Sequence, residues 1–80
     1  MTKAEFNKCE KLMYEAITKA RQAQEEYETA YAYLKVKNRT ACMCENGKAN
    51  QHYGEAVGIN QVLSVLGFKH EEMKTLADLL

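Results

Sequence analysis

Two cysteines and a histidine that lie close together in the sequence are the first candidates for metal binding or catalysis. Cys42 and Cys44 precede His52, and thiolates and imidazole are zinc ligands. Structural zinc sites usually place two residues between paired cysteines, whereas one residue separates these, and a fourth ligand would have to be Cys9 or His70. A cysteine nucleophile activated by His52 would also need an orienting third group, and no recognisable spacing supplies one. We therefore expect reduced thiols, no metal or other cofactor, and no catalytic residue.

A tyrosine and basic cluster is the stronger candidate for a binding site. Aromatic rings interleaved with cations can stack on bases and hold phosphates, so the cluster could bind a nucleotide at the interface of a homo-oligomer, with His52 as an added member, or a nucleic acid. The alternative is that the first tyrosines belong to a buried seam and the cations form a solvated face. The cluster consists of Tyr27, Tyr31, Tyr33, Lys35, Lys37 and Arg39.

A long N-terminal helix would position these tyrosines. No proline occurs in the chain, and nothing interrupts a helix from Thr2 to at least Lys37. Thr2 and Glu5 fit a capping box, in which each side chain accepts from the backbone amide of the other residue. The burial pattern is a heptad of large residues with a parallel row of small ones. Its members are Phe6, Met13, Ala20, Tyr27 and Leu34, then Cys9, Ala16, Ala23 and Ala30, flanked by Ile17 and Tyr31.

A turn and a shorter antiparallel helix should follow. Asn46-Gly47 is the strongest turn signal, so the first helix should end near Asn38 or continue toward Glu45. The second helix is expected from about Lys48 to Leu66, with Tyr53 and Asn60 near a face that buries Ala56, Val57, Leu63 and Leu66. Gly67 should end it in a Schellman cap that sets Phe68 against Leu63. A short third helix from Lys69 or His70 would bury Met73, Leu76, Ala77 and Leu80.

Gly54 and Gly58 lie in the middle of the expected second helix, where glycine costs roughly 1 kcal/mol relative to alanine. We favour close packing against Ala16, Ala20 or Ala23 as the reason. The alternative is that the bare backbone makes room for a ligand beside His52.

Helix lengths favour self-association. The first helix would be roughly 50 Å long and the second roughly 28 Å, so a simple hairpin would leave much of the seam uncovered. A second copy of the chain could cover it as a homodimer or higher homo-oligomer. The interface residues would be Phe6, Met13, Ala16, Ala20, Ala23, Gly54 and Gly58.

Composition limits the function further. Eighty residues suit a single helical domain, residues 1–80, and the equal numbers of cations and anions, eleven each, provide no bulk attraction to nucleic acid or to an anionic membrane. The first residues lack the apolar core of a signal peptide and no apolar run could span a bilayer, so a cytoplasmic location is expected.

The sequence thus predicts an all-α, non-enzymatic module that binds another protein through its helical faces. In size and plain composition it resembles the small helical accessory proteins with which phages and mobile elements bind and block a host factor. That resemblance implies an inhibitor or adaptor. The two alternatives are a nucleotide-binding protein and a nucleic-acid-binding protein.

Overall fold

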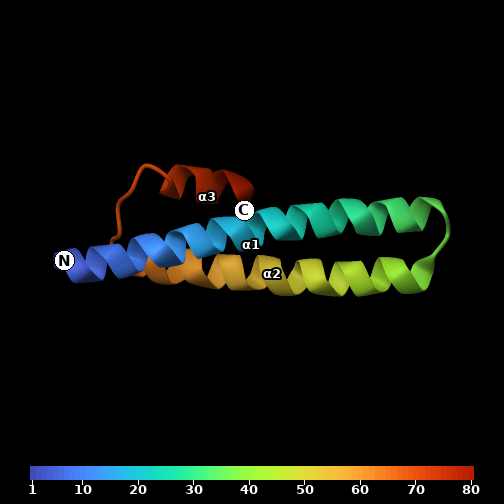
Figure 1. Cartoon of the computed structure of the whole chain (residues 1–80), viewed down its shortest axis with the longest axis horizontal. Coiled ribbons are helices and arrows are strands. Elements are labelled where there is room, and N and C mark those ends of the chain that lie inside the picture. Colours follow the sequence, from blue (N-terminus) through green and yellow to red (C-terminus); the bar gives the residue numbers. More distant parts are fainter.

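The computed structural model describes residues 1–80 and contains three helices and no strand. α1 spans Lys3–Lys35, α2 spans Arg39–Val65 and α3 spans Met73–Leu79. Figure 1 shows α1 and α2 antiparallel along the whole molecule, which measures 52 × 17 × 16 Å, with α3 folded back along the first half of α1. The predicted all-α fold, a helical hairpin followed by a short C-terminal helix, is confirmed.

α1 begins at the predicted cap. The Glu5 amide donates to Thr2 Oγ1 at 3.1 Å, and the Thr2 hydroxyl donates to Glu5 Oε1 at 3.0 Å. The first bond is half of the predicted capping box; the Glu5 carboxylate accepts from the hydroxyl where the backbone amide of Thr2 was expected.

The turn between α1 and α2 lies earlier than predicted. α1 ends at Lys35, close to Asn38, the earlier of its two expected ends, and α2 begins at Arg39 where Lys48 was expected. Asn46-Gly47, the predicted turn, lies inside α2. α2 is therefore 27 residues long against 33 in α1, and it accompanies α1 over most of its length.

Two capping motifs place the turn at Lys37. This residue adopts φ +61°, its amide donates to the Leu34 carbonyl at 3.0 Å, and the Asn38 amide donates to the Tyr33 carbonyl at 2.9 Å. These are the two bonds of a Schellman cap, here with lysine where glycine is usual. Asn38 then starts α2, because its Oδ1 accepts from the Ala41 amide at 3.2 Å.

The chain's own helices cover most of the predicted seam. Its buried members are Cys9, Met13, Ala16, Ile17, Ala20, Ala23 and Ala30, whereas Phe6, Tyr27, Tyr31 and Leu34 are exposed. The uncovered part of the seam is thus much shorter than expected, because α2 begins nine residues earlier than predicted. Met13, Ala16, Ala20 and Ala23 pack within one chain, and Phe6 contacts Phe68 with 5.2 Å between ring centroids.

The core differs between the two halves of the molecule. Near the termini it contains Cys9, Met13, Ala16, Ile17, Ala20, Ala56, Leu63, Phe68 and Leu76. Beyond it, the buried residues are Ala23, Ala30 and Ala49 alone, and we call this part of the α1–α2 hairpin the distal arm. Small side chains let the two backbones approach closely, so the arm is a helix pair with little apolar volume between its members.

The end of α2 follows the prediction closely. Gly67 adopts φ +71°, its amide donates to the Ser64 carbonyl at 3.1 Å, and the Phe68 amide donates to the Leu63 carbonyl at 3.0 Å. The Schellman cap is confirmed, and Phe68 is buried with Leu63. Leu66, which was expected in the core, is 56% exposed.

α3 begins later than predicted and buries less. Its first residue is Met73, because the Glu72 amide donates to His70 Nδ1 at 3.0 Å and holds the preceding residues in a turn. Leu76 is fully buried, whereas Ala77 is exposed.

The packing role predicted for Gly54 and Gly58 is wrong within the chain. Both are exposed, and a Cβ atom built on either glycine, or on Gly47, would have no heavy atom within 4 Å outside its own helix. α1 approaches α2 at Ala49 and Ala56 instead.

We expect Gly47→Ala, Gly54→Ala and Gly58→Ala each to raise the free energy of unfolding by up to about 1 kcal/mol, because alanine is the better helix former. Gly67→Ala should lower it by about 1 kcal/mol, because only glycine adopts φ +71° without strain. Urea denaturation followed by circular dichroism measures all four. A loss of stability in Gly54→Ala, or in Gly58→Ala at concentrations where the chain is monomeric, would contradict the exposed positions.

Candidate functional site

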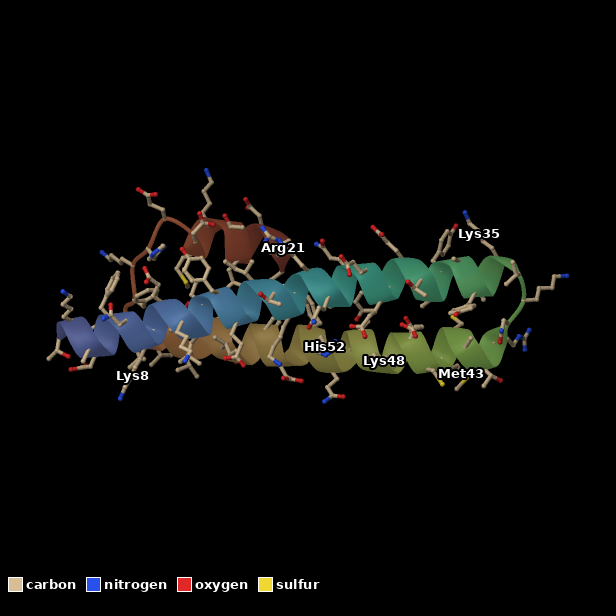
Figure 2. All side chains as sticks on the ribbon, in the orientation of Figure 1. Lys8, Arg21, Lys35, Met43, Lys48 and His52 are labelled. Carbon is tan, nitrogen blue, oxygen red and sulfur yellow. The ribbon has the colours of Figure 1, made fainter.

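The tyrosine and basic cluster lies at the hairpin tip, and the structure does not gather it into a pocket. Tyr31, Tyr33 and Lys35 occupy the last turns of α1, Lys37 lies in the turn, and Arg39 is the first residue of α2. Figure 2 shows Lys35 pointing outward from α1, on the side of the hairpin opposite to Met43. None of the residues from 31 to 40 is buried. The cluster therefore surrounds the end of the molecule as a convex surface.

Intramolecular contacts already occupy four members of the predicted site. Lys35 Nζ lies 4.7 Å from the Tyr31 ring centroid, a cation–π contact. The Tyr27 hydroxyl donates to Asn50 Oδ1. His52 Nδ1 lies 2.5 Å from Glu26 Oε1, and both side chains are half-buried between the helices. His52 thus joins α1 to α2, about 20 Å along α2 from the tip.

The thiols and histidines form no metal-binding cluster. Cys42 is half-buried and Cys44 exposed, Cys9 lies in the core, and all three are free thiols. His52 is about 12 Å or more further along α2 than Cys44. No group of three or more His, Cys, Asp or Glu side chains is placed to hold an ion.

His70 organises the region where α3 meets α1. Its ring lies about 6 Å from the rings of Phe6, Tyr14 and Phe68. Because its Nδ1 accepts from the Glu72 amide, the proton of the neutral ring is on Nε2, which donates to Glu10 Oε2 at 2.9 Å. This histidine is therefore engaged on both nitrogens in holding the fold.

The main hollow of the protein lies between α1 and α2, away from every site predicted from the sequence except Gly58. Its volume is about 440 Å³. A second hollow of about 350 Å³ lies on the outer side of α1 and shares Leu12 and Glu15 with the first. The first hollow is lined by Leu12, Glu15, Lys19, Glu55, Gly58, Ile59 and Val62, and the second by Lys8, Lys11, Leu12 and Glu15.

One ion pair crosses the first hollow. Lys19 Nζ lies 2.6 Å from Glu55 Oε2. The hydrogen bond from Lys19 lowers the pKa of Glu55, and the same bond raises the pKa of Lys19, in each case outweighing the loss of hydration. Both groups are therefore held in their charged forms on this face.

These lining residues could have been found from their spacing. Leu12, Glu15 and Lys19 recur at three and four residues along α1, beside the seam, as Glu55, Gly58, Ile59 and Val62 do along α2. This spacing did not stand out in α1 because the heptad of the seam is a stronger pattern. In α2 it was not recognised because the second helix was expected to start at Lys48, so its residues were not aligned with those of α1.

Comparisons with known proteins provide no relative. No protein-family model, no curated protein and no solved structure matches the chain. None of the three helices combines the length and the hydropathy needed to cross a lipid bilayer.

Proposed function

We propose that the protein is a non-enzymatic module that binds another protein through the hairpin tip. The tip surface comprises the apolar residues Tyr31, Leu34, Val36 and Met43 and the cations Lys35, Lys37 and Arg39. The observation that carries the proposal is the exposure of the apolar side chains at a point where the chain itself supplies nothing to cover them.

Large apolar side chains are exposed at the tip, as they are at the other end of α2, where Val62, Val65 and Leu66 are more than half exposed. Tyr31 is 60% exposed, Leu34 52%, Val36 72% and Met43 74%. Neighbouring exposed apolar side chains mark interaction surfaces in otherwise polar proteins. The tip therefore has the apolar content that a binding surface requires.

Lys37 supports a role for the tip in binding. A residue with a side chain in the left-handed conformation costs about 1–2 kcal/mol, and glycine would relieve that cost. Lysine at this position extends the row of cations around the turn. A residue that costs stability while adding charge to an exposed surface is typical of a functional position.

The charges define the partner's chemistry. Residues 29–44 include Lys35, Lys37 and Arg39 and no aspartate or glutamate, although the whole chain is neutral. An apolar segment with acidic flanks would complement this surface. An inhibitor or adaptor of the phage accessory type would act through such a contact.

Protein binding is favoured over the nucleotide and nucleic-acid alternatives. The two hollows lie away from the tip, and the Lys35 ammonium group already lies against the Tyr31 ring on which a base would stack. A convex apolar surface suits a protein partner better than it suits a small ligand.

The test is a selection from a phage-displayed library of helical peptides for binding to the whole protein. We expect the selected peptides to combine apolar and acidic residues, and Lys35→Ala/Lys37→Ala/Arg39→Ala to weaken their binding at least tenfold while helicity is retained, because exposed charges contribute little to folding. Lys37→Gly should raise the melting temperature and yet weaken the same peptides.

Arg21→Ala is the control, because it removes a cation on the α3 side of α1, far from the tip (Figure 2). Peptides that bind the triple variant as well as the parent would contradict the proposal. Fluorescence anisotropy with a mononucleotide and a single-stranded oligonucleotide tests the alternatives. If either probe binds the parent but not the triple variant, and no peptide binds, the corresponding alternative replaces the proposal.

A further inference from the structure

A second surface, independent of the tip, lies along α1 on the side away from α3. Figure 2 shows Lys8 on this side and Arg21 on the opposite one. Leu12 is its apolar centre, and Leu12 and Glu15 line both hollows of the protein. Lys8 and Glu15 have no ion-pair partner within the chain. We call this surface the α1 face.

The charges of the α1 face are arranged symmetrically about Leu12 with opposite signs. Its residues in order are Glu5, Lys8, Lys11, Leu12, Glu15 and Lys19, of which Lys11, at the edge of the row, is the one charge without a counterpart of opposite sign across the centre. When this row is laid antiparallel on itself, Lys8 of one copy meets Glu15 of the other, and Glu5 meets Lys19. The Lys8–Glu15 pairs are centred on the Lys11–Leu12 step and the Glu5–Lys19 pairs on Leu12, half a residue away, so Leu12 lies beside its own copy. Self-complementarity of this kind is what a two-fold symmetric interface requires.

We infer that the occupant of the α1 face is a second copy of this chain, with the two α1 helices antiparallel about Leu12. Each Lys8–Glu15 pair then forms twice, and the Leu12 side chains are covered at the centre. Lys19 keeps its bond to Glu55 and adds Glu5 of the second copy to the same cluster.

The apolar part of the hollow favours the same arrangement. With α1 on α1, the α2 helices also face each other, so that Ile59 and Val62 meet apolar side chains, and the exposed Gly58 leaves space for them. The opposite arrangement, α1 on α2 of the second copy, would set Lys8 and Glu15 against Ile59 and Val62, which offer no opposite charge.

The dimer has a definite shape. Antiparallel overlap centred on Leu12 pairs roughly the first half of the α1 helices and leaves the distal arms projecting from opposite ends. Two hairpin tips then point away from each other on one assembly. This inference does not rest on the proposed function of the tip, because its residues and its readout are different.

Sedimentation velocity with charge-reversal variants tests the inference. The parent should dimerise at micromolar to high micromolar concentration. Lys8→Glu and Glu15→Lys should each raise the dissociation constant on the order of tenfold, because each change makes two attractive pairs repulsive. The double variant Lys8→Glu/Glu15→Lys should restore it to within about threefold of the parent, because the pairs form again with reversed signs. Arg21→Glu, on the α3 side, should leave it unchanged.

A cysteine cross-link tests the register in the Cys42→Ser/Cys44→Ser background. Leu12→Cys should form a disulfide-linked dimer on mild oxidation, because residues beside the axis meet their own copies within disulfide reach. Gln22→Cys is the control, since its two copies would lie about 30 Å apart. A parent that stays monomeric at high micromolar concentration, a double variant that is not rescued, or equal cross-linking at both positions would overturn the inference.

Discussion

Leu63→Ala is expected to lower the free energy of unfolding by about 2–5 kcal/mol, the usual range for removing a fully buried leucine side chain. Leu63 is 0% exposed and belongs to the core cluster that joins all three helices. Its carbonyl also accepts from the Phe68 amide, so the residue connects the core to the cap that turns the chain toward α3. A cavity at this position would therefore loosen both the core and the cap at the end of α2.

The loss is large relative to what a chain of this size can hold. Twelve of the eighty residues are buried, and no disulfide supplements them. Domains of this length are generally stable by no more than a few kcal/mol. We therefore expect Leu63→Ala to be partly unfolded at room temperature.

Urea denaturation followed by circular dichroism at 222 nm measures the effect. Leu34→Ala is the matched control, because it removes the same atoms from an exposed position and should change the free energy of unfolding by less than about 0.5 kcal/mol. Equal losses in the two variants would mean that the core is not centred on Leu63.

The sequence was sufficient for the features that depend on local chemistry or on a strong period. The seam alanines, the cap at Thr2 and the Schellman turn at Gly67 all follow from residue type and spacing. Phe68 and Leu63 were paired correctly because the cap dictates which residues meet.

The position of the turn could not be predicted, because two local signals competed. Asn46-Gly47 is the usual turn dipeptide, whereas the real turn contains a lysine in the left-handed conformation. Asn38 decided the outcome as an N-cap, since a helix that starts there sets Ala49 against α1. Packing between α1 and α2 determined the position of the turn, and the residues that pack against each other cannot be identified from one sequence alone.

The same error displaced the candidate site. With α2 starting at Lys48, His52 would lie one turn from the hairpin's end and could join the basic cluster. In the structure His52 is well inside α2, where Glu26 holds it. The face around Leu12 and Val62 appeared only once both helices were aligned in their true register.

The distal arm links the two proposals physically. It carries the tip to one end of the molecule, and the α1 face lies at the other. Hydrogen bonds from Tyr27 to Asn50 and from His52 to Glu26 hold its helices together around three buried alanines. The stiffness of the arm therefore depends on close approach of the backbones more than on apolar area.

We expect Ala49→Leu to lower the free energy of unfolding by about 1–3 kcal/mol, the typical cost of overpacking. Ala49 is 0% exposed, and Asn50 and His52 beside it are bonded to α1. A leucine side chain has no space there, so α1 and α2 must separate and break those bonds. Hydrogen exchange should accelerate in the distal arm more than in α1 near Met13, because the larger core lies beyond the disturbance.

Ala32→Leu is the control, since it makes the same change at an exposed position on the arm and should alter stability by less than about 0.5 kcal/mol. If Ala49→Leu matched that control in both stability and exchange, the helices could not be in close contact at Ala49, and the arm would have to be held by its polar bonds alone.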